Sequence, residues 1–272
     1  MRTAKSFCLA IAFLSLVVAT ITEAQQAAAP RGCSLKSMTQ VGVDKSELTR
    51  RWSWAETGYN FTNVPQALKD PDPLIYALVK NVSREFRVYP RFYFFADHNK
   101  PNAFATSATE GAPGDYPDSM SSYGTVILGN SLVAQELTRD GGQGAIEAVL
   151  AHEFAHIMQF QRRFPMEGKL RELHADYLAG WHVGHLKRGE GAKPGDDEPP
   201  VAAPPDGIDA AYDEVAWFAA FYRRGDTDFY SKEHHGTKKQ RGDAFFAGFE
   251  CKSNTINGAY AEGERYVKSL GY

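Results

Sequence analysis

The sequence is poor in cysteine and has no excess of charge of one sign. It contains three cysteines among 272 residues, too few for the dense disulfide framework of a small secreted scaffold. Lys and Arg number 30 against 33 Asp and Glu, for a net charge of −3, and no basic cluster stands out. Nucleic acid or anionic lipid, which bind to such clusters, are therefore not expected as partners.

Long hydrophobic runs are also absent, except near the N-terminus. Residues 6–22 (SFCLAIAFLSLVVATIT) are uncharged and mostly apolar, and a short basic region precedes them. The run is short for a bilayer span of about 20 residues, and small residues up to Ala24 suit a signal peptidase. We therefore expect a signal peptide over residues 1–24 and an exported protein, secreted or periplasmic, with no membrane insertion after cleavage.

Cleavage after Ala24 would remove Cys8 and leave Cys33 and Cys251. An even number of cysteines in an oxidising compartment makes a Cys33–Cys251 disulfide an expectation. The alternative is two unpaired thiols, since sequence alone cannot supply the distance between them.

Short extended segments come first in the chain, and long helices follow. A helix is expected from about Pro73 to Phe86. Aromatic and β-branched residues predict strands at 87–96, 102–106 and 125–128. From Ser131 onward the pattern is helical, and the helices expected there are 144–162, 169–187, 208–224 and 239–250. This order predicts an α+β architecture, with one domain over 25–272 and a solvated Pro- and Gly-rich insert at 188–207.

The predicted helix 144–162 is apolar on nearly all sides, yet it carries His152, Glu153 and His156 in the pattern H-E-x-x-H. Histidines four positions apart project from one face, one turn apart, and can take two corners of a tetrahedral zinc site. Glu153 lies about 100° around the helix, where it can accept a proton from a metal-bound water. The alternative is two core histidines satisfied by backbone or carboxylate groups.

A catalytic zinc needs a third protein ligand and an open position for water. Glu172 and Asp176 stand four positions apart on the next predicted helix and share a face. Glu172 can bind the metal while Asp176 accepts the Nδ1–H of a ligand histidine and fixes its tautomer. Two ordinary surface acids are the alternative. His174 points about 200° away from Glu172, so we expect it to make no contribution to metal binding.

The other histidines carry weaker signals. On the helix 169–187, the residues His174, His182 and His185 are expected on a solvated or amphipathic face, rather than in a second metal site.

A second pair of histidines precedes the helix predicted at 239–250. His234 and His235 could stabilise an oxyanion. Alternatively, His235-Gly236-Thr237 is a loop whose threonine caps the helix, and we favour this cap.

Together, H-E-x-x-H followed by E-x-x-x-D resembles the signature of the gluzincin-type zinc metallopeptidases. The stretch 172–180 (ELHADYLAG) is similar to the E-L-x-A-D-x-x-A-G segment of the small bacterial neutral zinc metallopeptidases, and 235–241 resembles their H-G-[ST]-x-x-Q-R segment. Residues 102–105 (NAFA) resemble the strand ahead of the zinc helix in the CAAX-protease-like and HtpX-like minimal zincins.

The resemblance implies a zincin-like fold and one Zn²⁺ per chain, bound by His152, His156 and Glu172, with Asp176 behind the ligands. It also implies a metallopeptidase that hydrolyses a peptide or protein substrate by zinc-activated water, with Glu153 as general base; the expected signal peptide would make this an exported enzyme. The strand 102–106 could then offer its edge to an extended substrate. A non-proteolytic zinc-binding interaction protein on the same scaffold is the main alternative. An interaction domain with an accidental motif is a third.

Overall fold

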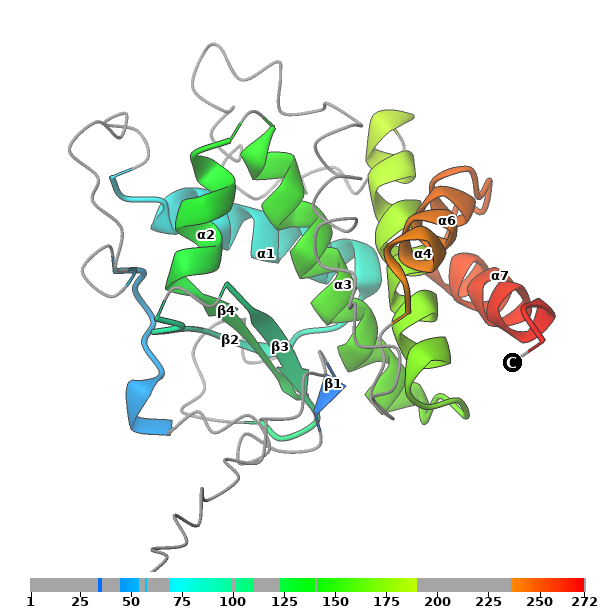
Figure 1. Cartoon of the computed structure of the whole chain (residues 1–272), viewed down its shortest axis with the longest axis horizontal. Coiled ribbons are helices and arrows are strands. Elements are labelled where there is room, and N and C mark those ends of the chain that lie inside the picture. The colour runs from blue at the N-terminus through cyan, green and yellow to red at the C-terminus, as the bar shows by residue number, and fades with distance from the viewer. Residues whose placement is uncertain are drawn as a thin grey trace, which may run out of the picture.

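The computed structural model describes residues 34–35, 45–53, 57, 69–98, 101–109, 123–139, 141–189 and 236–271. In this part of the chain a small sheet lies on one side and a group of helices on the other, so the architecture is mixed α+β (Figure 1). The expected signal peptide, the helix predicted at 208–224 and nearly all of the insert at 188–207 lie outside the described residues. Among the described residues, no helix combines the length and apolar character that a bilayer crossing requires.

One sheet contains four strands in the order β1-β3-β4-β2. The strands are β1 (Ser34–Leu35), β2 (Arg91–Phe95), β3 (Ala103–Thr106) and β4 (Thr125–Gly129). β4 runs parallel to β2 and antiparallel to β3. β1, which was not predicted, pairs in parallel with Ala105 and Thr106 of β3. The edge that was expected to receive a substrate is therefore occupied at these two residues.

The helices in the described part of the chain are α1 (Asp72–Phe86), α2 (Asn130–Leu137), α3 (Gly142–Arg162), α4 (Lys169–Lys187), α6 (Lys238–Phe249) and α7 (Ile256–Ser269). Four helices agree with predicted segments within a few residues, whereas no separate helix was predicted at the positions of α2 and α7. A short 3₁₀ turn spans Lys45–Glu47. α3 is followed by its C-cap residue Arg163, whose left-handed backbone (φ 53°) turns the chain towards α4.

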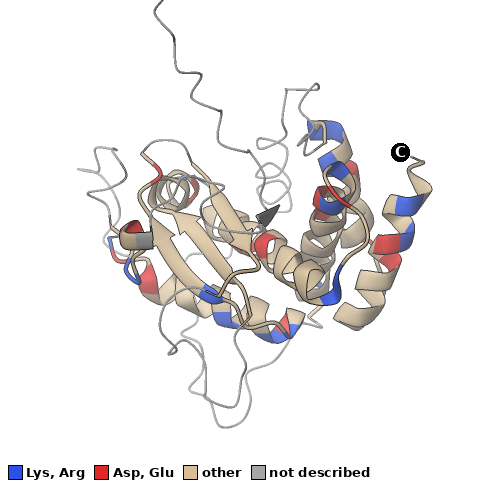
Figure 2. Ribbon diagram, turned by 90° about the horizontal axis from the view of Figure 1, so that it is seen from below, with Lys and Arg blue, Asp and Glu red and all other residues tan. Residues whose placement is uncertain are grey.

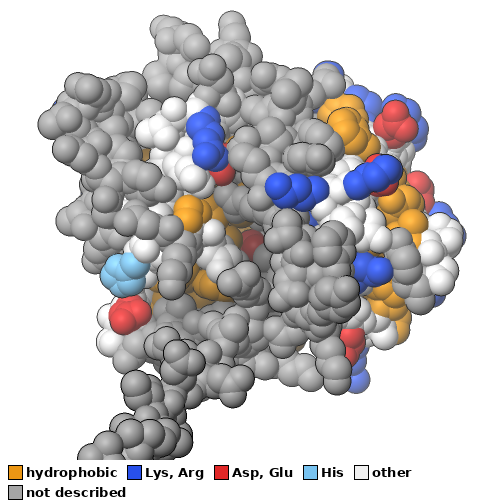
Figure 3. Space-filling model, viewed as in Figure 1, with side chains coloured by type: hydrophobic (Ala, Val, Ile, Leu, Met, Phe, Trp, Pro, Cys, Tyr) orange, Lys and Arg blue, Asp and Glu red, His pale blue; other side chains and the backbone are white. Residues whose placement is uncertain are grey.

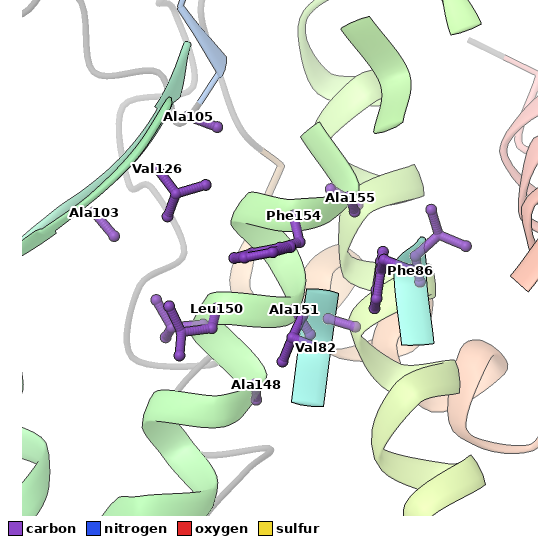
Figure 4. Close-up of a cluster of buried hydrophobic side chains, with 14 of the residues drawn as sticks. Val82, Phe86, Ala103, Ala105, Val126, Ala148, Leu150, Ala151, Phe154 and Ala155 are labelled. Carbon is purple, nitrogen blue, oxygen red and sulfur yellow. The ribbon is translucent and has the colours of Figure 1, made fainter. Parts of the chain in front are cut away.

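α3 lies between the sheet and the other helices, which explains its nearly continuous apolar character. On one side Phe154 points towards Val126 of the sheet (Figure 4). On the other side Ala151 and Ala155 point towards α1, where Val82 and Phe86 lie. A helix buried on both sides has no solvent for polar side chains, so each of them needs a partner inside the protein.

α4 and α6 pack with their backbones almost in contact. A methyl group on Gly180 would lie 1.9 Å from the carbonyl oxygen of Phe245, and one on Gly248 would lie 1.8 Å from that of Tyr177. Only residues without a side chain permit this approach. The contact matters because α6 carries Arg241, which reaches the centre described below.

Charged side chains lie mainly on the outer helices, whereas the sheet is almost free of them (Figure 2). On the face shown in Figure 3, basic, acidic and hydrophobic side chains are interspersed over the helices at the right. Inside the helical layer, α3 and α4 together carry four buried acids: Glu147, Glu153, Glu172 and Asp176.

Candidate metal centre

α3 and α4 bring three predicted ligands together. The Nε2 atoms of His152 and His156 lie 3.0 Å apart. Carboxylate oxygens of Glu172 lie 3.4 Å from His152 Nε2 and 3.5 Å from His156 Nε2. All three side chains are buried, and their ligand atoms lie within 4.8 Å of one another. In the part of the chain that the structure describes, no other group of this kind is found.

His152 lies against Asp176, the acid expected behind the ligands. Its Nδ1 lies 2.9 Å from Asp176 Oδ1. An ionised carboxylate can only accept, so the proton of the neutral ring belongs on Nδ1 and the lone pair of Nε2 faces the other ligands. Burial alone would raise the pKa of Asp176, but the charge and hydrogen bonds of Arg241 hold it below its ordinary value. Asp176 is therefore ionised and suited to this role.

His156 is oriented by an uncharged group, Gln159. Its Nδ1 lies 2.8 Å from Gln159 Oε1. The amide nitrogen of Gln159 donates to the backbone carbonyl of Arg171 at 2.9 Å, which fixes which end of the amide faces His156. Because Oε1 can only accept, His156 Nδ1 must donate. The lone pair of its Nε2 then also points into the centre.

Two imidazole lone pairs and one carboxylate thus converge in a buried space. Such a group of acceptors requires a positive charge, which a proton or a metal ion can supply. Burial lowers the pKa of His156, which disfavours the proton. Two nitrogens and one carboxylate also form a common donor set for a divalent transition metal in a catalytic site. The residues present therefore fit a metal ion.

Arg241 is a member of the site that was not predicted. Its Nε donates to Asp176 Oδ2 at 2.8 Å and a terminal nitrogen donates to Oδ1 at 2.7 Å, and both side chains are buried. This bidentate pair is among the strong hydrogen-bonded ion pairs. The sequence contained one indication of this residue, because the H-G-[ST]-x-x-Q-R segment noted above ends at Arg241.

The same segment starts α6, and the predicted threonine cap is confirmed. Thr237 Oγ accepts the backbone N–H of Gln240 at 3.1 Å, and Gln240 Oε1 accepts the backbone N–H of Thr237 at 2.9 Å. This capping box fixes the start of the helix and so the position of Arg241 four residues on. His234 and His235 lie outside the described residues.

The expectation of a solvated face for the other histidines of α4 is wrong. His174, His182 and His185 are all buried, because α3, α6 and α7 pack against α4. His182 Nε2 lies 3.3 Å from Glu147 of α3, and His185 Nε2 lies 3.1 Å from Glu85 of α1. These two pairs join α4 to neighbouring helices, and His174 takes part in a different arrangement described below.

Glu153, the predicted general base, is buried on α3 beside His152.

As for the predicted disulfide, Cys33 lies outside the described residues. The Cys251 thiol is buried and donates to Glu262 at 3.3 Å, and burial raises its pKa. The Cys33–Cys251 bridge stays a prediction.

No protein-family model, no curated protein and no solved structure matches this chain.

Proposed function

We propose that the protein is an exported zinc metallopeptidase with a zincin-like fold of the gluzincin type. The observation that carries the proposal is the convergence of His152, His156 and Glu172, with Glu153 on the same helix as the two histidines. A structural zinc site has four protein ligands and needs no base. Three ligands with an adjacent glutamate are typical of a hydrolytic site instead.

When bound, zinc would polarise a substrate carbonyl and lower the pKa of a bound water to about 7. The side chains of the protein have the remaining roles. Glu153 accepts the proton of the attacking water and delivers it to the leaving amine. Asp176 and Gln159 each hold one ligand histidine with its Nε2 lone pair directed to the centre. Arg241 keeps Asp176 ionised and in place.

Substitution of Glu153 tests this function. Purified protein should contain one zinc per chain and should cleave unfolded casein. Glu153→Gln should keep the zinc, because Glu153 is no ligand, and should lose turnover by about 10³-fold or more. Glu147→Gln is the matched control, since Glu147 is a buried glutamate of the same helix that contacts His182. Wild-type turnover in Glu153→Gln would show that another group is the base. Zinc binding without any hydrolysis would favour the non-proteolytic alternative.

A further inference from the structure

The hydrogen bonds behind His156 continue beyond Gln159. The amide nitrogen of Gln159 lies 3.0 Å from His174 Nδ1, and His174 Nε2 lies 3.1 Å from the backbone carbonyl oxygen of Tyr260 in α7. Gln159 and His174 are fully buried. The candidate metal centre is thus connected, through two side chains, to the backbone of the C-terminal helix.

Each hydrogen bond in this series determines the donor and acceptor roles in the next one. The carbonyl of Tyr260 can only accept, so His174 carries its proton on Nε2 and accepts at Nδ1. With its single proton on Nε2 and an accepting Nδ1, the ring of His174 is neutral. The amide nitrogen of Gln159 has two hydrogens, one for His174 Nδ1 and one for the carbonyl of Arg171. Gln159 must then present its oxygen to His156.

Packing holds the ring of His174 in place. Phe164 stacks on it, with ring centroids 4.3 Å apart and an angle of 22° between the planes, and the ring of Tyr260 meets it edge-on at 4.6 Å. On α7, a methyl group on Gly263 would lie 3.2 Å from His174 Nε2. The glycine therefore lets the backbone of α7 come close enough for the hydrogen bond.

We propose that Gln159 and His174 are positioning residues of the metal centre, which hold His156 in the Nδ1–H tautomer and link its orientation to α7. The inference rests on the proposed metal site but not on peptidase activity. It also revises the expectation that His174 makes no contribution to metal binding. The two ligand histidines are held differently: His152 by a carboxylate with its own arginine, and His156 by a neutral chain that ends on a backbone carbonyl.

Zinc affinity, measured by competition with a chromophoric chelator, provides the first test. Partners of ligand histidines contribute about 10- to 100-fold to metal affinity. Gln159→Leu should therefore bind zinc about 10- to 100-fold more weakly than the wild type. His174→Leu should lose about tenfold, because Gln159 remains but is no longer fixed. His174→Gln keeps one acceptor and one donor and should bind zinc nearly as the wild type does. The control is His182→Leu, which removes another fully buried histidine of α4 and should leave the affinity unchanged.

The tautomer of His156 in metal-free protein provides the second test. Nitrogen-15 NMR of the imidazoles should show Nδ1–H alone in the wild type and a mixture of tautomers in Gln159→Leu and His174→Leu. Wild-type affinity and an unchanged tautomer in His174→Leu would overturn the inference. An equal loss of affinity in His182→Leu would overturn it as well, since the effect would then come from general loosening of α4. A wild type that fails the peptidase assay would leave both tests valid, because neither of them measures hydrolysis. The tautomer test uses metal-free protein, so it can be carried out even if the wild type binds no zinc.

Discussion

At the scale of single residues, Asp176 connects the candidate metal centre to α6. It is fully buried and lies between His152 and Arg241. An ionised carboxylate in such a place is tolerated only when its charge and lone pairs are matched. Arg241 supplies the charge from α6 through two hydrogen bonds to Asp176, and so helps to decide whether His152 is held correctly.

Arg241→Met should therefore damage both stability and metal binding. The free energy of unfolding should fall by about 3–5 kcal/mol, because a buried carboxylate loses its cation. Zinc affinity should fall about tenfold or more through His152. Denaturant unfolding and chelator competition measure the two effects. The control is Lys239→Met on the same helix, which removes an exposed ion pair with Asp243 and should cost less than about 1 kcal/mol. Equal losses in both variants would contradict the assigned role of Arg241.

Glu172→Ala addresses the third ligand. Removal of one of three protein ligands should weaken zinc binding by orders of magnitude and abolish hydrolysis, because no other described carboxylate belongs to the ligand group with His152 and His156. Glu167→Ala, at the exposed acid just before α4, should leave both unchanged. Zinc affinity again decides, and a larger loss in His174→Leu than in Glu172→Ala would overturn the gluzincin assignment.

At the scale of helices and strands, the contact between α4 and α6 sets the position of Arg241. The two backbones approach because Gly180 and Gly248 have no side chains. The capping box at Thr237 fixes where α6 begins. Together these two features place Arg241 against Asp176, and neither of them depends on a bound metal.

Gly248→Ala tests that contact. Alanine favours a helix by about 1 kcal/mol over glycine, so an increase in stability would follow if the surroundings were open. Here the new methyl group meets the carbonyl of Tyr177, and overpacking of this kind costs about 3 kcal/mol. We expect a net loss of unfolding free energy and weaker zinc binding. Ala247→Ser, at the half-buried neighbouring position, should change neither quantity appreciably. A more stable Gly248→Ala would show that the helices separate easily.

The sequence predicted the elements with strong local patterns and missed those defined by distant contacts. The bounds of α3 and α4 were predicted well, since the apolar residues and the intervening RRFPMEG loop are local signals. α7 was missed because Gly258 and Gly263 lower its helix propensity, although Gly263 is needed for close packing. The burial of His174 could not be predicted, because helical periodicity carries no information on how many neighbours a helix has.

The candidate site also combines residues that local patterns predict with residues that only distant contacts bring together. His152, His156 and Glu172 follow from spacing within two helices, and the structure brings them together. Arg241 is 65 residues from Asp176 along the chain, and Tyr260 is 86 residues from His174. Such pairings depend on how α6 and α7 pack against α4, which no local pattern encodes.

At the scale of the whole molecule, the centre is assembled by the core rather than by the metal. α3 is held from one side by the sheet and from the other by α1 and α4. α4 is held in turn by α6 and α7. Both ligand-bearing helices therefore have packing partners that owe nothing to zinc. The metal should add stability to a protein that is already folded, unlike in small zinc domains, where folding and binding coincide.

Removal of the metal tests this view. Metal-free protein should keep its helical circular dichroism and unfold cooperatively. Zinc at 1,000 times its Kd should raise the unfolding free energy by about 4 kcal/mol, which for a chain of this size raises Tm by about 10 °C. The gain should vanish in the double variant His152→Gln/His156→Gln, in which two of the three ligands are replaced, whereas Glu153→Gln should keep it. Because Glu153→Gln should also be inactive, the pair separates metal binding from catalysis. Loss of helical structure on chelation would contradict the argument, since the metal would then be needed to bring α3 and α4 together.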